Sequence, residues 1–167
     1  LAAIYRDGAP YLGEVPAARL KLALERAWTG LQRLRATPVE EDRFLRLAAA
    51  LATVGAALDN AGPEQAVKMV GTWLGQAAAL GLPAGHSPTL DAVKLVALKW
   101  VLEVAPEAAR PTVVRALLLT AQDLAQRLHP SLPGLAGAQT AAFPADYLAA
   151  PSFAHYVLYT DFAGPRP

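Results

Sequence analysis

Apolar residues recur at steps of three and four along most of this chain, and the clearest example lies between Thr37 and Asn60. Five large apolar side chains in this stretch fall on one face of a helix: Phe44, Leu47, Leu51, Val54 and Leu58. The pattern predicts an amphipathic helix over about residues 38–59, covered on one side by other helices.

The polar residues at the start of this stretch predict where the helix begins. Thr37 is a good N-cap, Pro38 suits the first helical position, and Glu40 follows Thr37 at the spacing of a capping box. Glu40, Glu41 and Asp42 place negative charge at the positive end of the helix dipole. We therefore interpret the three acids as capping residues and not as an acid–base pair.

The same periodicity predicts four further helices, over about residues 17–35, 64–80, 88–104 and 111–128. Proline and glycine mark their ends, and Asn60 and Gly62, followed by Pro63, should end the helix over residues 38–59. The link between the first two helices would be so short that they form an antiparallel hairpin. Residues 1–16 show no period and contain several glycines and prolines, so we expect the end of a preceding element plus a connection there.

These elements predict an all-α fold in two parts. Residues 1–130 would form an array of antiparallel helix pairs, and residues 131–167 a loop followed by a short aromatic helix packed on the array. Pairs of helices recur roughly every 46–50 residues, close to the ~40–47 of HEAT and armadillo repeats. A single helical bundle gives the same rhythm, so an α-α superhelix (HEAT-like) segment and a bundle both remain open.

The composition excludes several classes of protein. Apolar residues make up 54% of the chain and the net charge is +1, so the overall charge does not predict a nucleic-acid binder. There is no cysteine, which suits an intracellular, reducing compartment. The uncharged runs are too short or too broken to cross a membrane. Because the chain begins at Leu1, we read it as a piece of something larger or as a trimmed chain.

The residues that could carry chemistry do not form a recognisable site. His86, His129 and His155 have no ligand-like spacing, and no phosphate-binding loop or nucleophile elbow is present. We therefore expect no catalytic residue, no cofactor and no metal.

Two patterns remain as candidate binding features. Arg19, Arg26 and Arg33 are spaced by seven and would form a stripe that meets phosphates or an acidic partner, although a solvated helix face is the simpler interpretation. One tryptophan falls among the apolar positions of each of three helices: Trp28, Trp73 and Trp100. Core packing explains the tryptophans most simply, and a shared ligand pocket is the alternative.

The order of several short motifs resembles a known family. The motifs are the leucine-rich helix with Phe44-Leu45-Arg46-Leu47, the turn His86-Ser87-Pro88 into a helix bearing Trp100, the apolar helix 113–128 and the aromatic segment 152–162. In this order they resemble the exportin branch of the importin-β (karyopherin) HEAT-repeat family. The nearest likeness is to the exportins of double-stranded RNA and microRNA precursors.

The resemblance implies a segment of a superhelical transport receptor, found in the nucleus and cytoplasm. Such receptors bind the small GTPase Ran, and RNA or protein cargo, on a concave surface. We therefore expect a non-catalytic helical scaffold, with a protein partner and with RNA as a further partner. The alternative function is a stand-alone bacterial helical-bundle adaptor or regulatory protein-interaction domain. An enzyme or small-ligand protein that uses the tryptophan-lined interior is a third alternative.

Overall fold

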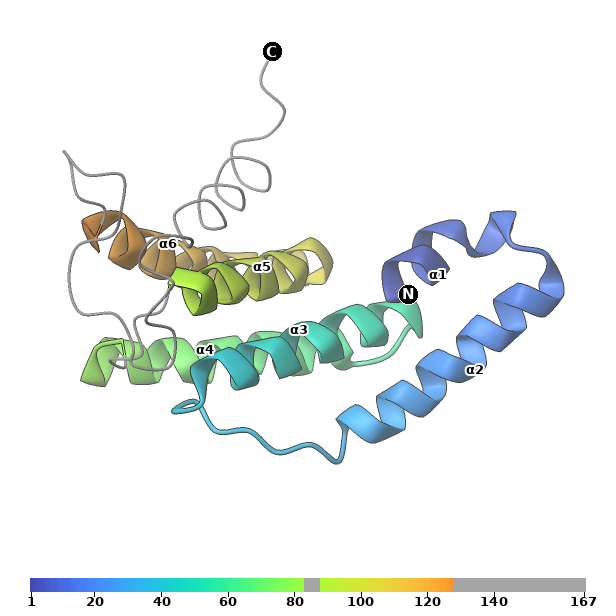
Figure 1. The fold of residues 1–167 in the computed structure, drawn as a ribbon, viewed down its shortest axis with the longest axis horizontal. Helices are drawn as coiled ribbons and strands as arrows, with labels where there is room; N and C mark the ends of the chain where they lie inside the picture. The colour runs from blue at the N-terminus through green and yellow to red at the C-terminus, as the bar shows by residue number, and fades with distance from the viewer. Residues whose placement is uncertain (83–87, 128–167) are drawn as a thin grey trace, which may run out of the picture.

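In the computed structural model, residues 1–82 and 88–127 are described, and every regular element in these ranges is helical (Figure 1). The elements follow in the order α1 (Ala2–Gly8), the 3-10 turn η1 (Ala9–Tyr11), α2 (Glu14–Leu31), α3 (Glu41–Ala57), α4 (Gly62–Leu80), α5 (Pro88–Val104), the 3-10 turn η2 (Glu107–Ala109) and α6 (Arg110–Arg127). The predicted all-α fold is confirmed. Residues 131–167, with their predicted aromatic helix, lie outside the described residues.

Helices α4, α5 and α6 lie within two residues of their predicted bounds. Pro63 occupies the first turn of α4, where no backbone N–H is needed, and Gly81 ends α4 with a positive φ of 77°. One expectation about these boundaries was wrong. Gly62 does not end α3 but begins α4.

The N-terminal part differs most from the prediction. Residues 1–16, expected as the end of an element plus a connection, contain α1, η1 and the first turn of α2, because Pro10 and Pro16 both fall at helix starts that tolerate proline. Helix α2 ends at Leu31 and α3 begins only at Glu41. The predicted short hairpin between these helices is therefore wrong, since residues 32–40 form a long link.

The predicted capping box forms only in part. The Glu40 carboxylate accepts a hydrogen bond from the Thr37 backbone N–H at 3.2 Å, as the box requires. The Thr37 hydroxyl lies 3.4 Å from the same carboxylate and donates to it, so it does not cap the helix. This Thr37 N–H, followed by the guanidinium of Arg43, lowers the pKa of Glu40. The turn precedes the helix, which explains why α3 starts later than predicted.

Helix α3 is the centre of the fold and packs against α1, α2, α4 and α5. Its buried residues include the predicted Phe44, Leu51 and Val54 but also Ala48, Ala49 and Ala52, which extend the buried surface around the helix beyond the predicted stripe. Small alanine side chains let neighbouring helices approach closely. The expectation of a helix covered on one side was therefore wrong.

The turn between α3 and α4 is held by two glycines in contact. A Cβ placed on Gly55 would lie 2.5 Å from Gly62 Cα, and the Asn60 side-chain oxygen accepts the Gly62 N–H at 3.0 Å. The glycines inside α4, Gly71 and Gly75, make no comparable backbone contact. Gly75 has nothing within 4 Å, and Gly71 meets only the Thr112 side chain, at 3.8 Å.

The four helices that follow residue 40 form two stacked pairs. Helix α3 pairs with α4 and α5 with α6, and the pairs stack α3 on α5 and α4 on α6 (Figure 1). Helices α1 and α2 lie at one end and to one side of this stack, and residues 32–40 connect them to it (Figure 1). Leu24 is the only buried residue among residues 1–40.

Candidate functional site

Three ionisable side chains and one indole form a buried cluster where α3, α4 and α5 meet. The Lys94 ammonium lies 3.0 Å from Glu41 Oε2 and 2.7 Å from Asp91 Oδ1, and all three side chains are at most 8% exposed. The indole N–H of Trp73 donates to Glu41 Oε1 at 2.9 Å. We call Glu41, Trp73, Asp91 and Lys94 the ionic cluster.

The ionic cluster carries a net negative charge that the helices themselves offset. Glu41 lies in the first turn of α3 and Asp91 in the first turn of α5, where the helix dipole stabilises carboxylates. Burial alone would lower the pKa of Lys94, but the carboxylates of Asp91 and Glu41 outweigh this effect and the pKa is raised. A lysine held protonated in this way is in the opposite state from an amine nucleophile. The arrangement can therefore fix three helices relative to one another.

The sequence contained a signal for this cluster that the capping argument hid. Glu41 precedes Leu45 by four residues, and Lys94 precedes Leu98 by four, so both charges lie on the buried faces of their helices. The contacts join residues 32 and 53 positions apart, which no local spacing can predict.

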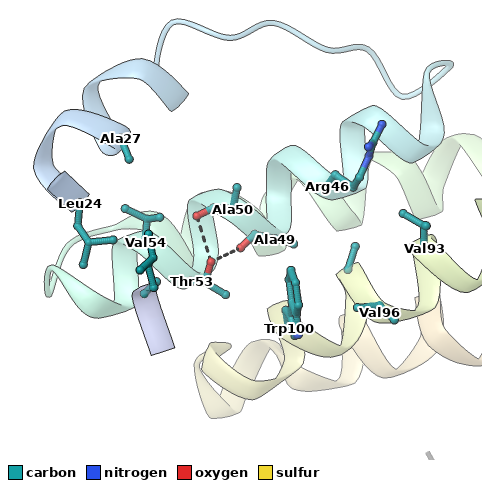
Figure 2. A pocket seen from close by; sticks show the side chains of 13 residues that line it. Leu24, Ala27, Arg46, Ala49, Ala50, Thr53, Val54, Val93, Val96 and Trp100 are labelled. Atoms are coloured by element: carbon teal, nitrogen blue, oxygen red, sulfur yellow. Dashed lines mark hydrogen bonds between the residues drawn. The ribbon is translucent and has the colours of Figure 1, made fainter. Parts of the chain in front are cut away.

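An open apolar groove runs over the other side of α3, between α2 and α5 (Figure 2). Its volume is about 580 Å³. Its floor comes from α3, one wall from α5 and the other from α2, and α1 closes one end. We call this the α3–α5 groove, and its lining residues are Leu1, Ala2, Leu24, Ala27, Arg46, Ala49, Ala50, Thr53, Val54, Val93, Val96, Ala97 and Trp100.

The floor of the groove is small and almost without free polar groups. Ala49 and Ala50 present only methyl groups, and the Thr53 hydroxyl donates to their backbone carbonyls at 2.9 and 3.3 Å. Arg46 is the only charged side chain that lines the groove within the described residues, and it pairs with Asp42 at 2.8 Å. The groove therefore offers an apolar surface with one cation at its edge.

The α5 wall of the groove consists of apolar residues that have the three-and-four spacing of a core face. Val93 and Val96 are half-buried and Trp100 is 49% exposed (Figure 2). The true core face of α5 contains Leu95, Leu98 and Val101 together with the charged Asp91 and Lys94. The apolar spacing of α5 therefore indicates the wrong buried face, because the charged residues Asp91 and Lys94 lie on the face that is buried.

The three tryptophans do not share a pocket. Trp73 is 1% exposed and belongs to the ionic cluster, as core packing predicted. Trp100 lines the α3–α5 groove, and Trp28 is half-buried on α2.

The arginine stripe is shorter than the spacing predicted. Arg19 and Arg26 are exposed on α2, on the face opposite Leu24, but α2 ends before Arg33. Neither Arg19 nor Arg26 forms an ion pair within residues 1–82 and 88–127. They remain candidates for contact with an acidic partner or phosphate.

Two further properties concern only the part of the chain that the structure describes. It contains no group of three His, Cys, Asp or Glu side chains arranged to hold a metal ion, while His86, His129 and His155 fall outside it. None of its helices combines the length and the apolar character needed to cross a membrane.

No protein-family model, curated protein or solved structure matches the chain.

Proposed function

We propose that the protein is a non-catalytic interaction module that binds an amphipathic helix of a protein partner in the α3–α5 groove. The observation that carries this proposal is the groove itself, which is open, lined almost wholly by apolar side chains and bordered by a half-exposed tryptophan. Apolar surface of this kind is a common mark of a binding site, and tryptophan is among the strongest anchors in protein interfaces.

The shape of the groove supports a helical occupant. Helix α3 lines it with residues 46, 49, 50, 53 and 54, and α5 lines it with residues 93, 96, 97 and 100. Both sets follow the three-and-four spacing of one helix face, so the groove runs along two helices. A partner helix with large apolar side chains at positions i, i+3, i+4 and i+7 would match this surface.

The position of Arg46 favours a partner helix that carries an acidic residue. Its side chain is 60% exposed and lies at the edge of the groove, where a second carboxylate can reach it beside Asp42. The contribution to affinity would be small because an exposed ion pair contributes little, but the pair would set the direction of the bound helix.

A labelled amphipathic peptide tests this proposal. Two peptides would share one apolar face and carry either glutamate or lysine at the end that meets Arg46. We expect the glutamate peptide to bind more tightly, and Ala50→Trp, which fills the groove floor, to weaken binding at least tenfold, about 1.4 kcal/mol. Ala79→Trp, at an exposed position of α4, is the matched control and should bind like the unchanged protein. Equal binding by both variants would contradict the proposal.

A second candidate function is the transport-receptor segment that the exportin resemblance implies. The stacking of α3 on α5 and α4 on α6 favours it, because arrays of helix pairs stack in this way. In this function the partner would be RNA or a small GTPase, and the exposed Arg19 and Arg26 would face phosphates. Binding to a short RNA duplex that persists in the double variant Arg19→Glu, Arg26→Glu would remove this role for the arginines.

A further inference from the structure

The N-terminal arm, which we define as residues 1–31, is loosely attached to the rest of the molecule. Leu24 is the only buried residue of α1, η1 and α2 together, although α2 alone has 18 residues. By contrast, nine of the 17 residues of α3 are buried. An isolated helix of this length has marginal stability in water, so α2 depends on its contacts with the rest of the protein. Because few of its residues are buried, these contacts hold the arm only weakly.

The apolar side chains of α2 face α3 without packing tightly against it. Leu20, Trp28 and Leu31 are only half-buried, although they lie on the same face as Leu24. Besides the α3–α5 groove, two smaller cavities of about 240 and 250 Å³ lie between α3 and the end of α2 with its link. The C-terminal half of α2, from Leu24 to Leu31, therefore rests over unfilled space.

The link that follows α2 adds little restraint. Residues 32–40 contain no helix, and a hydrogen bond at 3.0 Å from Gln32 Nε2 to Gln65 Oε1 joins the link to α4 at an exposed position. An exposed side-chain hydrogen bond contributes little net stability because water competes for both groups. Ala36 is half-buried against the core, whereas residues 32–35 before it are all exposed, so these four residues can act as a hinge without breaking a buried contact.

We propose that the arm is a hinged cover for the α3–α5 groove. When it closes, the apolar face of α2 moves across the floor formed by Ala50 and Thr53 toward the α5 wall. When it opens, the same floor is free for the partner helix. Closure gains the burial of Leu20, Trp28 and Leu31, and partner binding gains the burial of the groove, so the two compete.

This competition is a regulation of the proposed binding site and rests on the proposed function. The apparent affinity for a partner falls in proportion to the fraction of molecules that are open. A change at Leu20 or Leu31 that weakens α2 against α3 would therefore tighten partner binding without altering a residue that lines the groove.

A pair of introduced cysteines tests the closure itself. The chain contains no cysteine, so the double variant Ala27→Cys, Val96→Cys has thiols only on the two opposing walls of the groove. A disulfide needs Cβ atoms about 3.5–4.5 Å apart, which requires the walls to meet. The matched control is Arg26→Cys, Val96→Cys, in which the α2 thiol lies on the opposite face of the helix.

We expect the Ala27 pair to form a disulfide at least tenfold faster than the control pair under mild oxidation. The bridged protein should bind the glutamate peptide at least tenfold more weakly, and reduction should restore binding. Equal bridging rates in the two variants, or full peptide binding by the bridged protein, would overturn the proposal.

Hydrogen exchange on the unmodified chain gives an independent test. Backbone amides in the middle of α2 should exchange at least tenfold faster than those in the middle of α3, and equal protection would overturn the hinged cover. These results are separable from the proposed function. If the unmodified protein fails to bind the peptide, the binding proposal is wrong, while bridging and exchange still decide whether the arm closes.

Discussion

The indole N–H of Trp73 donates a hydrogen bond to Glu41 at 2.9 Å and thereby joins α4 to the first turn of α3. The other oxygen of the same carboxylate accepts from Lys94 on α5. One side chain, Glu41, therefore connects three helices in the interior. The groove on the opposite side of α3 is formed by two of these helices, so its width depends on this connection.

Trp73→Phe should destabilise the protein by about 1–3 kcal/mol, because it leaves a buried carboxylate oxygen without its donor while keeping most of the aromatic packing. Urea unfolding followed by circular dichroism measures this loss. Trp100→Phe is the matched control, since Trp100 is half-exposed and makes no such bond, and its effect should stay within about 0.5 kcal/mol. Similar losses for the two variants would contradict the role given to the hydrogen bond.

Lys94→Met should cost about 3–5 kcal/mol of unfolding free energy, because it leaves the carboxylates of Glu41 and Asp91 buried without their cation. Arg46→Met removes a cation from an ion pair of similar length at an exposed position and should cost less than about 1 kcal/mol. A loss below 1 kcal/mol for Lys94→Met would show that the ionic cluster is not formed in solution.

The ionic cluster also predicts a dependence of stability on alkaline pH. The pKa of Lys94 in the folded protein is raised above its ordinary value of 10.5. Its contribution is therefore fully present below pH 10.5 and is lost as the pH rises through the folded value. Unfolding free energy measured from neutral to strongly alkaline pH should fall more steeply in the unchanged protein than in Lys94→Met. Parallel curves would contradict the raised pKa.

Gly55→Ala should destabilise the protein by about 3 kcal/mol, because the new methyl group would meet backbone atoms of Gly62 that cannot move aside. Gly30→Ala in α2 is the matched control, since no atom lies within 4 Å of its Cβ position, and it should stabilise the helix by about 0.5–1 kcal/mol. Thermal unfolding of both variants measures the difference. A Gly55→Ala protein as stable as the unchanged one would show that α3 and α4 do not cross at these glycines.

Much of the fold was predictable because local signals agreed with it. Pro63, Gly81 and Pro106 lie at helix ends, and the apolar spacing between them gave α4 and α5 almost to the residue. The start of α3 was not predictable from its capping residues, since Thr37 and Glu40 satisfy each other in a turn before the helix. The link after α2 was longer than expected partly for this reason and partly because α2 ends at Leu31, four residues before its predicted end.

The candidate site was harder to predict than the helices. Val93, Val96 and Trp100 have the spacing of a core face, and nothing in the sequence distinguishes a covered apolar face from an open one. The ionic cluster pairs Glu41 with a lysine 53 residues away, a distance over which periodicity carries no information. Only the packing of α3 against α5 brings these groups together.

The most direct test of helix binding in the α3–α5 groove is an NMR titration of the three indole N–H signals with the glutamate peptide. Trp100 lines the groove, whereas Trp73 is buried in the ionic cluster on the other side of α3. We predict that the Trp100 signal shifts in a saturable way while the Trp73 signal stays in place. A Trp100 signal that does not move at saturating peptide, or one that moves no more than that of Trp73, would contradict binding in the groove.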